Sequence, residues 1–424
     1  MAHFEDLAGF IQRTSARAPA VREILERAGA RPEEIRNRTA LARLPVTRKT
    51  DLIDRQRAAP PFGGFLGVAQ EELQRIFMSP GPLYDPHGQG KDYWRWGEAL
   101  QEAGFRRGDL VLNTFSYHLS PAGFMFDEAL RSLGAVVIPA GVGNTELQVR
   151  LLADLAITGY VGTPSFLATL LDKAVELGYD PAGWRLQKAF VTAERLPDSL
   201  RDRLQGQGIA VFQGYGTADV GCVAYECGVR EGLHLSTAVI VEIVDPETGQ
   251  PALPGEVGEI VVTVLDETYP LLRFGTGDLS LILTEPCRCG RETPRLGGLR
   301  GRLGDAVKVK GMFVYLRQIE EVMQRFPQVG RYQVIVSRED HRDHLLLRWN
   351  PGGGGGSPAA ATGEPAPAEG EGSEEDARLT SGDVSGILAT FRDIIRLRPE
   401  IEVLPPGSIP EGAKGLEDRR QWNA

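Results

Sequence analysis

The sequence predicts an α/β protein with two domains. We expect a large N-terminal domain, with a parallel sheet flanked by helices plus a β-rich subdomain, and a small mobile α+β C-terminal domain. Three observations indicate this. Strand-like and helical patterns alternate between about residues 108 and 213. A β-rich pattern follows, and a Gly-, Ala-, Pro- and Glu-rich stretch then interrupts the last set of elements.

The bulk composition is that of a globular protein. The chain has 424 residues, of which 42% are hydrophobic and 25% charged, so it can form two or three domains. The formal net charge of -10 gives no electrostatic footprint for nucleic acid or an anionic membrane, and no apolar run approaches the roughly 20 residues of a membrane span. The acidic start argues against a secretory peptide. We therefore expect a cytoplasmic protein, in which four cysteines favour metal binding, catalysis or plain burial over disulfides.

The N-terminal domain is expected over residues 1–303. Residues 1–75 form a helical lead-in, and the α/β core follows over residues 76–222. The strands of the core are expected at 110–114, 135–138, 159–162, 188–192 and 210–213. Its helices are expected at 121–133, from Thr145, at 164–178 and from Leu196. Thr145 and Gln148 have the spacing of a capping box.

The β-rich part of this domain is expected over residues 223–303, with strands at 239–244, 259–264 and 269–274. The C-terminal domain spans residues 304–424. Its strands are expected at 307–309, 332–336, 344–348 and 401–404, and its helices at 316–325 and 384–397. Residues 351–378 are predicted to be a disordered insertion because they offer few apolar groups; a functional acidic tether is the alternative.

Two segments carry residues suited to a nucleotide. Ligands bind beyond the carboxyl ends of parallel strands, where the loop 213–221 offers Tyr215 to stack on a base, Gly216 for close backbone approach and Asp219 for a metal ion. A tight turn around a packed tyrosine is the alternative. Further on, the run 269–274 is expected to end in a glycine turn that leaves Asp278 on a loop, as a carboxylate able to accept hydrogen bonds from a diol.

These motifs, taken together, resemble the adenylate-forming superfamily of acyl and aryl acid ligases, most closely its phenylacetate-CoA ligase branch. The resemblance covers nearly the whole chain. The matching pieces are Tyr215-Gly216 with Asp219, Ala193-Glu194, Pro270-Leu271-Leu272-Arg273-Phe274 with Thr276 and Asp278, Gly301-Arg302 with Asp305, and Phe313-Val314 with Gln318-Ile319-Glu320.

The resemblance implies a role for each matched residue. Tyr215 would stack on the adenine of ATP or AMP, Asp219 would lie near Mg²⁺, and Asp278 would bind the ribose hydroxyls. Arg302 would lie close to the nucleotide, and Lys414 would contact carboxylate and phosphate during adenylation, although the family usually places this lysine directly after a glycine. The other expected nucleotide contacts are Ser79, Gly81, Ala193, Glu194, Gly216 and Thr217.

The phosphate side departs from the family pattern. A phosphate loop rich in Ser, Thr and Gly is usual, because hydroxyls and free amides must surround the triphosphate. Residues 77–84 contain two prolines here, and only Ser79 and Gly81 keep the expected character. Ala218 stands where a hydroxyl is usual, and Asp219 where Glu is more common. Two alternatives follow: the triphosphate is held differently, with help from Lys91 or Tyr84, or adenylation is slow or absent.

Two short pairs of ligating residues predict a metal site. Cys227 with His234 and Cys287 with Cys289 could close a tetrahedral Cys3His zinc site, which would be structural because it leaves no open position. Some phenylacetate-CoA ligase relatives carry such a zinc. The alternative is a set of unmetallated thiols. Cys222 is the spare thiol and is expected to be buried.

The acid substrate is expected beside the nucleotide loop. Tyr117 and His118 are the pocket residues that we would test first, and Phe115, Phe124 and Phe126 are further aromatic candidates. Phe124 and Phe126 have the spacing of core residues, and His118 has a purely structural alternative.

The leading hypothesis is an ATP-dependent acid-CoA ligase. A carboxylate would attack the α-phosphate to give an acyl-adenylate, the terminal domain would rotate about a joint near Gly304 and Asp305, and CoA would take the acyl group. A non-catalytic relative that binds a nucleotide or acyl-adenylate is the main alternative. A zinc-knuckle nucleic-acid binder is opposed by the acidic charge. The family also suggests a homodimer.

Overall fold

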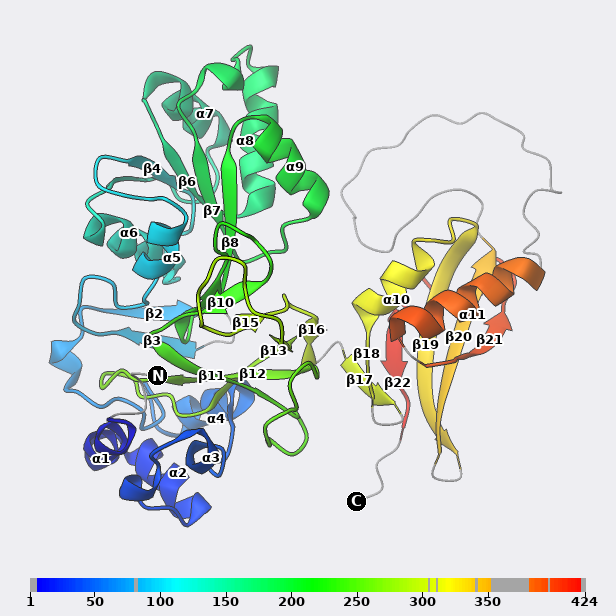
Figure 1. Cartoon of the computed structure of the whole chain (residues 1–424), viewed down its shortest axis with the longest axis horizontal. Helices are drawn as coiled ribbons and strands as arrows, with labels where there is room; N and C mark the ends of the chain where they lie inside the picture. Colours follow the sequence, from blue (N-terminus) through cyan, green and yellow to red (C-terminus); the bar gives the residue numbers. More distant parts are fainter. Residues whose placement is uncertain are drawn as a thin grey trace. The chain divides into compact units, whose positions relative to one another are not determined.

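The computed structural model describes residues 6–79, 83–303, 306–309, 312–339, 342–351, 381–395 and 397–420. The chain forms two compact units, Met1–Leu299 and Arg300–Ala424, so the division lies close to the expected boundary at residue 303 (Figure 1). The expected joint at Gly304 and Asp305 lies outside the described residues, as does the expected insertion 351–378 apart from Pro351, the last residue of a strand.

A mixed sheet of nine strands forms the centre of the first unit (Figure 1). In spatial order its strands are β14 (Ile282–Leu283), β15 (Arg295–Leu296), β10 (Leu233–Leu235), β9 (Gly221–Tyr225), β8 (Ala210–Thr217), β7 (Lys188–Val191), β6 (Gly159–Gly162), β4 (Leu110–Asn113) and β5 (Val136–Pro139). Strands β8, β7, β6, β4 and β5 are parallel, which confirms the predicted parallel sheet. The remaining strands extend this sheet in antiparallel pairs.

Helices cover both faces of the parallel part. They are α5 (Gly97–Glu102), α6 (Ala122–Ser132), α7 (Thr145–Asp154), α8 (Pro164–Glu176), η4 (Pro181–Gly183) and α9 (Asp198–Gly206). Neighbouring residues of β4 point to opposite faces, so Val111 packs in the core with α5 and α6, whereas Leu112 packs in the core with α7, α8 and α9. Because helices bury both faces of the sheet, residues that point to either face are apolar, and each strand is a short apolar run.

The predicted capping box at the start of α7 is wrong. Thr145 is the first helical residue, and the N-cap is Asn144, in the left-handed conformation with φ 49°. The Gln148 side chain donates instead to the carbonyl oxygens of Gly141 and Gly143, at 3.0 and 2.8 Å. Gln148 therefore ties down the loop that precedes the helix rather than its first turn.

A second sheet packs with the N-terminal helices. Its strand order is β1 (Thr47–Arg48), β13 (Phe274–Ser280), β12 (Gly258–Val264) and β11 (Val239–Val244). The lead-in contains α1 (Leu7–Arg17), α2 (Pro19–Ala28), η2 (Pro32–Glu34), α3 (Arg38–Leu41), α4 (Lys49–Ala58) and η3 (Gln70–Glu72). Apolar residues of α1 and α2, such as Ile11 and Val21, share one core with Val241 and Val262 of the sheet.

Two expected loops are strands in the structure. β13 begins where the expected strand 269–274 ends, and it includes Asp278; the register shifts where Gly277 adopts φ 76°, a bulge that lets the strand continue. The segment 77–84, expected as a phosphate loop, lies mostly in the antiparallel hairpin of β2 (Arg75–Ser79) and β3 (Leu83–His87). Gly81 lies outside the described residues.

The second unit is α+β. Its sheet has the strand order β21 (Glu400–Val403), β20 (Arg342–Pro351), β19 (Val329–Glu339) and β22 (Leu416–Asp418). The other elements are β16 (Gly301–Arg302), β17 (Ala306–Val309), β18 (Met312–Tyr315), α10 (Leu316–Met323) and α11 (Ser381–Ile395). Apolar residues of both helices, such as Val322 and Phe391, share one core with Val334 and Leu347.

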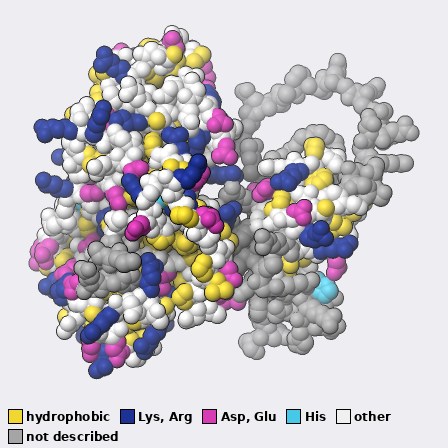
Figure 2. All heavy atoms as spheres, viewed as in Figure 1, with side chains coloured by type: hydrophobic (Ala, Val, Ile, Leu, Met, Phe, Trp, Pro, Cys, Tyr) yellow, Lys and Arg dark blue, Asp and Glu magenta, His cyan; other side chains and the backbone are white. Residues whose placement is uncertain are grey.

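Within the residues that the structure describes, no helix combines the length and the apolar character that a membrane span requires. On the face shown in Figure 2, the Lys and Arg side chains of the first unit are interspersed with those of Asp and Glu.

Candidate functional site

Tyr215 and Asp278, which the sequence separates by 63 positions, meet in the structure. The Tyr215 hydroxyl donates to Asp278 Oδ2 at 2.9 Å and lies 3.1 Å from Thr276 Oγ1. Both residues are buried. Tyr215 belongs to β8, which continues past the expected end at Gln213, and Asp278 belongs to β13, so two rigid strands hold the pair. The pair therefore places an aromatic side chain, Tyr215, next to the Asp278 carboxylate.

The local sequence permits this close approach of strands. A Cβ added to Gly216 would lie 2.2 Å from the Gly221 carbonyl oxygen and 2.6 Å from the Trp96 ring, so only glycine fits there. Thr217 ends β8, and its hydroxyl oxygen accepts a hydrogen bond from Val220 N at 3.3 Å. The turn after β8 is therefore compact, and it delivers Asp219 to a buried position.

Asp219 lies in a buried polar cluster with two residues that the sequence did not single out. Lys49 Nζ, at the start of α4, lies 3.2 Å from Asp219 Oδ2, whereas Asp219 Oδ1 has no hydrogen-bond partner among the described residues. Asp85, in β3, is the second such residue. Burial and the charge of Asp219 raise the pKa of Asp85 to about 7, against the opposing effects of the Ser79 hydroxyl and Lys49.

A small cavity of about 10 Å³, room for one water molecule, adjoins this cluster. It is lined by Asp85, Arg95, Ala218, Asp219 and Tyr269, among others. Ser79 is buried at the end of β2, whereas Tyr84 is 44% exposed and Lys91 is exposed. The cluster thus combines carboxylates with one lysine beside the hairpin that replaces the usual phosphate loop.

Ala193 and Glu194 form the turn after β7. Ala193 adopts φ 72°, which costs an L-residue roughly 1–2 kcal/mol and marks a turn that the surrounding structure holds in place. The Glu194 carboxylate accepts a hydrogen bond from Ser165 N at 2.6 Å, in the first turn of α8. Glu194 therefore satisfies one of the free amides at that helix end.

The residues expected to line the acid pocket divide into three groups. Tyr117 is half-buried, and its hydroxyl accepts from Asn113 Nδ2 at 2.8 Å and donates to Asp127 Oδ2 at 3.1 Å. Burial and then Asp127 raise the pKa of Tyr117. His118 is exposed. The aromatic candidates Phe115, Phe124 and Phe126 belong to or pack against the α5/α6 core, with Phe115 stacked on Phe126 at a centroid distance of 5.0 Å.

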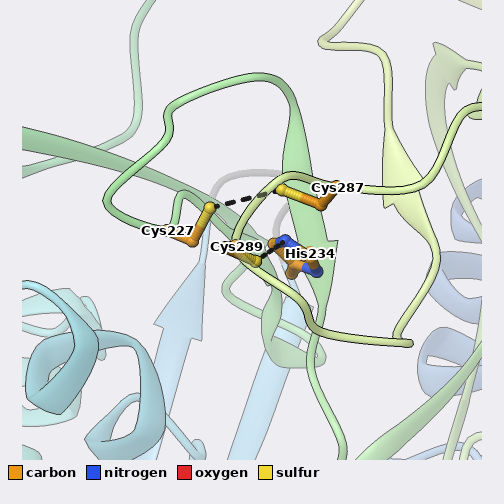
Figure 3. Close-up of side chains that lie close together, drawn as sticks. All are labelled: Cys227, His234, Cys287 and Cys289. Atoms are coloured by element: carbon orange, nitrogen blue, oxygen red, sulfur yellow. Dashed lines mark hydrogen bonds between the residues drawn. The ribbon is translucent and has the colours of Figure 1, made fainter.

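Three cysteines and one histidine converge in the first unit (Figure 3). Ligand atoms of Cys227, His234, Cys287 and Cys289 all lie within 4.8 Å of one another. The sulfur atoms of Cys227 and Cys287 are 3.7 Å apart. A tetrahedral zinc with bonds of about 2.3 Å to sulfur requires about 3.8 Å between two thiolates, so these residues fit the ion.

Electrostatics of this cluster also suit a metal. His234 Nδ1 lies 2.8 Å from Thr293 Oγ1 and 3.1 Å from the Thr293 carbonyl oxygen, whereas Nε2 lies 3.3 Å from Cys289 Sγ. Burial lowers the pKa of His234, which keeps the imidazole neutral. Burial opposes ionisation of Cys287, but hydrogen bonds from the Cys289 amide and the neighbouring thiols outweigh it and lower the pKa. The remaining thiol, Cys222, is fully buried as expected.

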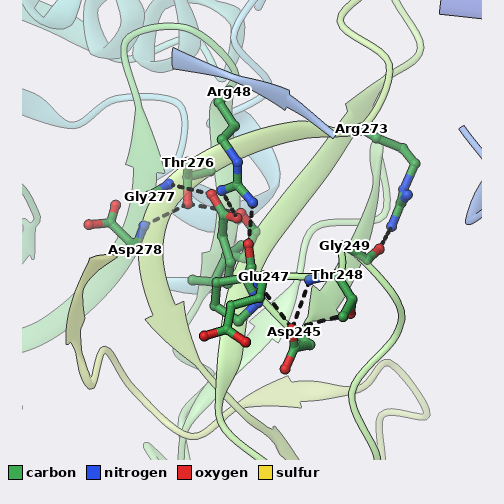
Figure 4. Close-up of polar contacts among 12 residues, drawn as sticks. Arg48, Asp245, Glu247, Thr248, Gly249, Arg273, Thr276, Gly277 and Asp278 are labelled. Atoms are coloured by element: carbon green, nitrogen blue, oxygen red, sulfur yellow. Dashed lines mark hydrogen bonds and ion pairs between the residues drawn. The ribbon is translucent and has the colours of Figure 1, made fainter. Parts of the chain in front are cut away.

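A buried arginine organises the segment that leads to Asp278. Arg273 is 1% exposed, and its Nε donates to Glu242 Oε2 at 3.0 Å. Its Nη1 donates to the carbonyl oxygen of Ala42 at 3.0 Å. Its Nη2 donates to the carbonyl oxygen of Gly249 at 2.8 Å (Figure 4). Arg273, which was matched to the family motif, therefore joins the lead-in, the turn after β11 and the start of β13.

A second ion pair connects the Asp278 strand to α4. Arg48 Nη1 lies 2.6 Å from Glu259 Oε2, and Glu259 Oε1 accepts a hydrogen bond from Gly277 N at 3.2 Å (Figure 4). Arg48 is followed directly by Lys49, and Gly277 directly by Asp278. The two acidic candidates, Asp219 and Asp278, are thus both linked to the start of α4.

The remaining candidates, Arg302 and Lys414, lie in the second unit. Arg302 is exposed in β16. Lys414 is exposed in the loop before β22, where it lines a cleft of about 630 Å³ together with Gln333, Arg348 and Arg419.

Several known proteins are similar to this chain in sequence or in fold. The family model of the AMP-binding enzymes matches residues 95–264. The phenylacetate-coenzyme A ligase of Thermus thermophilus is 32% identical over 413 residues, which cover 94% of this chain and 91% of that protein. The enzyme of the same name from Pseudomonas putida is 32% identical and matches 78% of this chain and 77% of its own.

A solved structure shares the fold. It is the crystal structure of an open conformation of 2-hydroxyisobutyryl-CoA ligase in complex with 2-HIB-AMP and CoA, with a TM-score of 0.82. At 24% identity the match covers 97% of this chain and 90% of that chain. Since a relative of 32% identity spans nearly the whole sequence, this chain belongs to the phenylacetate-CoA ligase family of adenylate-forming enzymes.

Proposed function

We propose that this protein is an ATP-dependent, AMP-forming acid-CoA ligase that activates an aryl or related carboxylate as an acyl-adenylate and transfers the acyl group to CoA. The observation that carries the proposal is the Tyr215–Asp278 pair, held by two strands in a chain of this family. An aromatic ring suits the adenine, and a carboxylate suits the two ribose hydroxyls.

The first half-reaction needs no general base. The substrate carboxylate is already ionised, and it attacks the α-phosphate of ATP so that pyrophosphate leaves. In the second half-reaction the CoA thiol loses its proton to solvent and its sulfur attacks the acyl carbon. The bond between the acyl carbon and the phosphate oxygen then breaks, and AMP leaves. Positioning and charge stabilisation therefore carry the catalysis. We assign charge stabilisation of carboxylate and phosphate to Lys414 and contact with the nucleotide to Arg302.

The nucleotide would lie against the ends of the parallel strands. We assign Gly216, Thr217, Ala193 and Glu194 to the wall of the nucleotide site, where the glycine permits close approach of backbone amides to phosphate. We assign Ser79 and Gly81 to the phosphate side, although Ser79 is buried.

Magnesium would bind at Asp219. The unpartnered, buried Oδ1 of Asp219 is a suitable ligand for a hard cation, and Lys49 holds the other oxygen. The ion would neutralise charge on the phosphates. The close Lys49 ammonium also adds a positive charge on a side of the site where the hairpin 77–84 offers few amide donors.

A structural zinc is the second cofactor that we propose, with Cys227, His234, Cys287 and Cys289 as ligands. The support is the spacing of the ligand atoms and the hydrogen bonding of His234 Nδ1, which leaves Nε2 for the metal. Such a site would join the β9–β10 region to the loop after β14.

Tyr117 and His118 remain our proposed contacts for the acid, and of these His118 is the more accessible because the Tyr117 hydroxyl is bound to Asn113 and Asp127. We also propose a cytoplasmic location, consistent with four free cysteines, and a homodimer on the pattern of the family.

A non-catalytic relative that binds nucleotide is the second candidate function. It is favoured by the hairpin 77–84 and by Ala218, which leave the phosphate side with few hydroxyl and amide donors. Both candidates predict nucleotide binding, so affinity alone does not separate them.

The test is acyl-adenylate formation. Purified protein is incubated with ATP, Mg²⁺ and a panel of aryl and short aliphatic acids, and pyrophosphate and acyl-AMP are quantified with and without CoA. A ligase gives acyl-AMP with at least one acid and acyl-CoA when CoA is added. Measurable ATP binding without turnover of any acid supports the non-catalytic candidate.

A further inference from the structure

The second unit contains a fully satisfied buried amide next to the loop that carries Lys414. Gln333 lies in β19 and is 2% exposed. Its Nε2 donates to the Lys414 carbonyl oxygen at 2.9 Å and to Glu417 Oε2 at 3.0 Å. Its Oε1 accepts from Arg348 Nε at 3.0 Å and also from Arg348 Nη2. The amide thus uses both donors and both acceptor positions.

The register of the sheet explains how this arrangement forms. Gln333 and Arg348 are directly paired across the antiparallel strands β19 and β20. β19 also pairs in parallel with β22, and Val334 N donates to the Gly415 carbonyl oxygen at 2.9 Å. The side-chain bond of Gln333 to Lys414 therefore extends the backbone ladder by one residue, into the loop before β22.

A second side chain of β19 holds the same loop further upstream. Arg331 Nη2 donates to Glu411 Oε1, and Arg331 Nη1 lies 3.4 Å from the Ile409 carbonyl oxygen. Arg331 therefore holds the loop near its start, and Gln333 holds it at its end. The ion pair of Arg331 with Glu411 is exposed and its contact with Ile409 is long, at 3.4 Å, whereas Gln333 bonds to Lys414 at 2.9 Å in a part-buried position, which makes Gln333 the stronger constraint.

The side chain of Lys414 has no such constraint. Among the residues that the structure describes, no hydrogen bond or close ion pair holds the Lys414 ammonium, and the residue is exposed on the wall of the 630 Å³ cleft. Its charge acts on the nearby Glu417, whose pKa is lowered by the hydrogen bond from Arg419 and, to a smaller extent, by Lys414. The backbone of Lys414 is fixed while its charge is available. This is the arrangement expected of a lysine that must meet an anionic group reproducibly.

We propose that Gln333 is a positioning residue for Lys414 in acyl-adenylate formation. The inference rests on the proposed function and on the role assigned there to Lys414. Gln333 itself touches no substrate; it fixes the main chain of the lysine through one hydrogen bond and anchors its own orientation through Arg348.

Two substitutions separate positioning from folding. Gln333→Met keeps the shape of the side chain and removes all four hydrogen bonds. Gln333→Glu keeps acceptance from Arg348 but places a carboxylate against the Lys414 carbonyl oxygen and Glu417. Asn350→Leu is the matched control, because Asn350 is also a buried amide in this sheet, 5% exposed, whose Oδ1 accepts from Arg331 N at 2.7 Å without touching Lys414.

The two half-reactions are measured separately. Acyl-AMP formation is followed by single-turnover quench with ATP and acid, and thioester formation is followed with supplied acyl-AMP and CoA. We expect Gln333→Met and Gln333→Glu to slow acyl-AMP formation at least tenfold, in the direction of Lys414→Ala, and to change the thioester rate less than threefold. Asn350→Leu should lower the melting temperature comparably to Gln333→Met without selective loss of the first half-reaction.

Each other outcome is decisive. Wild-type protein without acyl-AMP formation would refute the proposed function itself, and a Lys414→Ala variant with the wild-type rate would refute the role of that lysine. If Lys414→Ala is slow while both Gln333 variants form acyl-AMP at the wild-type rate, the positioning role alone is wrong. Equal loss of both half-reactions in the Gln333 variants would assign Gln333 to general folding and overturn the inference.

Discussion

Replacing Arg273 with methionine should cost the first unit several kcal/mol of stability. Arg273 is 1% exposed and pairs with Glu242, whose side chain is 5% exposed, at 3.0 Å. Methionine has a side chain of similar length but leaves Glu242 as a buried charge without Arg273. It also removes the hydrogen-bond donors to the main-chain carbonyl oxygens of Ala42, Leu44 and Gly249. Breaking one partner of a buried pair costs about 3–5 kcal/mol.

The expected change in melting temperature follows from the size of the unit. For residues 1–299, an unfolding entropy of about 2.1 cal/mol/K per residue gives about 0.6 kcal/mol/K, so the loss corresponds to about 5–8 °C. The assay is calorimetric or circular-dichroism melting at pH 8. Arg57→Met is the surface control, because Arg57 is 70% exposed and its pair with Asp54 contributes less than about 1 kcal/mol.

The loss of stability caused by Arg273→Met should depend on pH. Burial raises the pKa of Glu242, and Arg273 opposes that rise. Without Arg273 the pKa rises further, so a protonated Glu242 is favoured in the folded state and stability falls as pH increases through the folded-state pKa. The destabilisation by Arg273→Met should therefore be smaller at pH 5 than at pH 8. The double variant Arg273→Met, Glu242→Gln should be more stable than Arg273→Met alone. An Arg273→Met variant that is as stable as the wild type at pH 8 would refute the stabilising role of the Arg273–Glu242 pair.

Two further predictions concern the nucleotide and the metal. Asp278→Asn should weaken ATP and AMP binding at least tenfold, as measured by calorimetric titration. The melting temperature should change little, because the Tyr215 hydroxyl can still donate to the amide oxygen of the asparagine. Unchanged nucleotide affinity would contradict the assignment of Asp278 to the ribose. Elemental analysis should find about one zinc per chain, which Cys289→Ser loses and Cys222→Ser retains; equal zinc in both variants would contradict the four-ligand site.

The sequence predicted the parallel sheet well because its signal is local. Short apolar runs such as β4 and β7 alternate with amphipathic helices, and each parallel strand begins within one residue of its expected start. The family was also predicted from the spacing of motifs, and the comparison with known proteins confirms it. The spacing within the pairs Cys227/His234 and Cys287/Cys289 predicted one shared site, and the structure brings all four residues together.

The strands that were missed contain residues with weak strand propensity. β8 continues through Gly214 and Gly216, and β13 continues through Gly275 and Gly277, where glycine indicated a turn. In both strands the glycines are needed for close packing or a bulge. A prediction from propensity therefore ended β8 too early. It also placed a strand wrongly at residues 269–274, where β13 only begins, and so put Asp278 on a loop.

The polar partners of the site could not be found from sequence because they are distant along the chain. Lys49 lies 170 positions before Asp219, and the backbone of Lys414 is held by Gln333, 81 positions earlier. Neither Lys49 nor Gln333 stands in a recognisable motif. Asp85 directly follows the segment that was taken for a loop, and its burial became evident only when that segment proved to be a hairpin.

The proposed acid-CoA ligase function is tested most directly by the product balance of one reaction mixture. Protein, ATP, Mg²⁺, CoA and the best acid of the panel are combined, and AMP, pyrophosphate and acyl-CoA are quantified together. An acid-CoA ligase gives the three products in equal amounts. When CoA is omitted, acyl-AMP and pyrophosphate should form in equal amounts, and neither free AMP nor acyl-CoA should appear. Tight ATP binding without any of these products, for every acid tested, would contradict the proposed function.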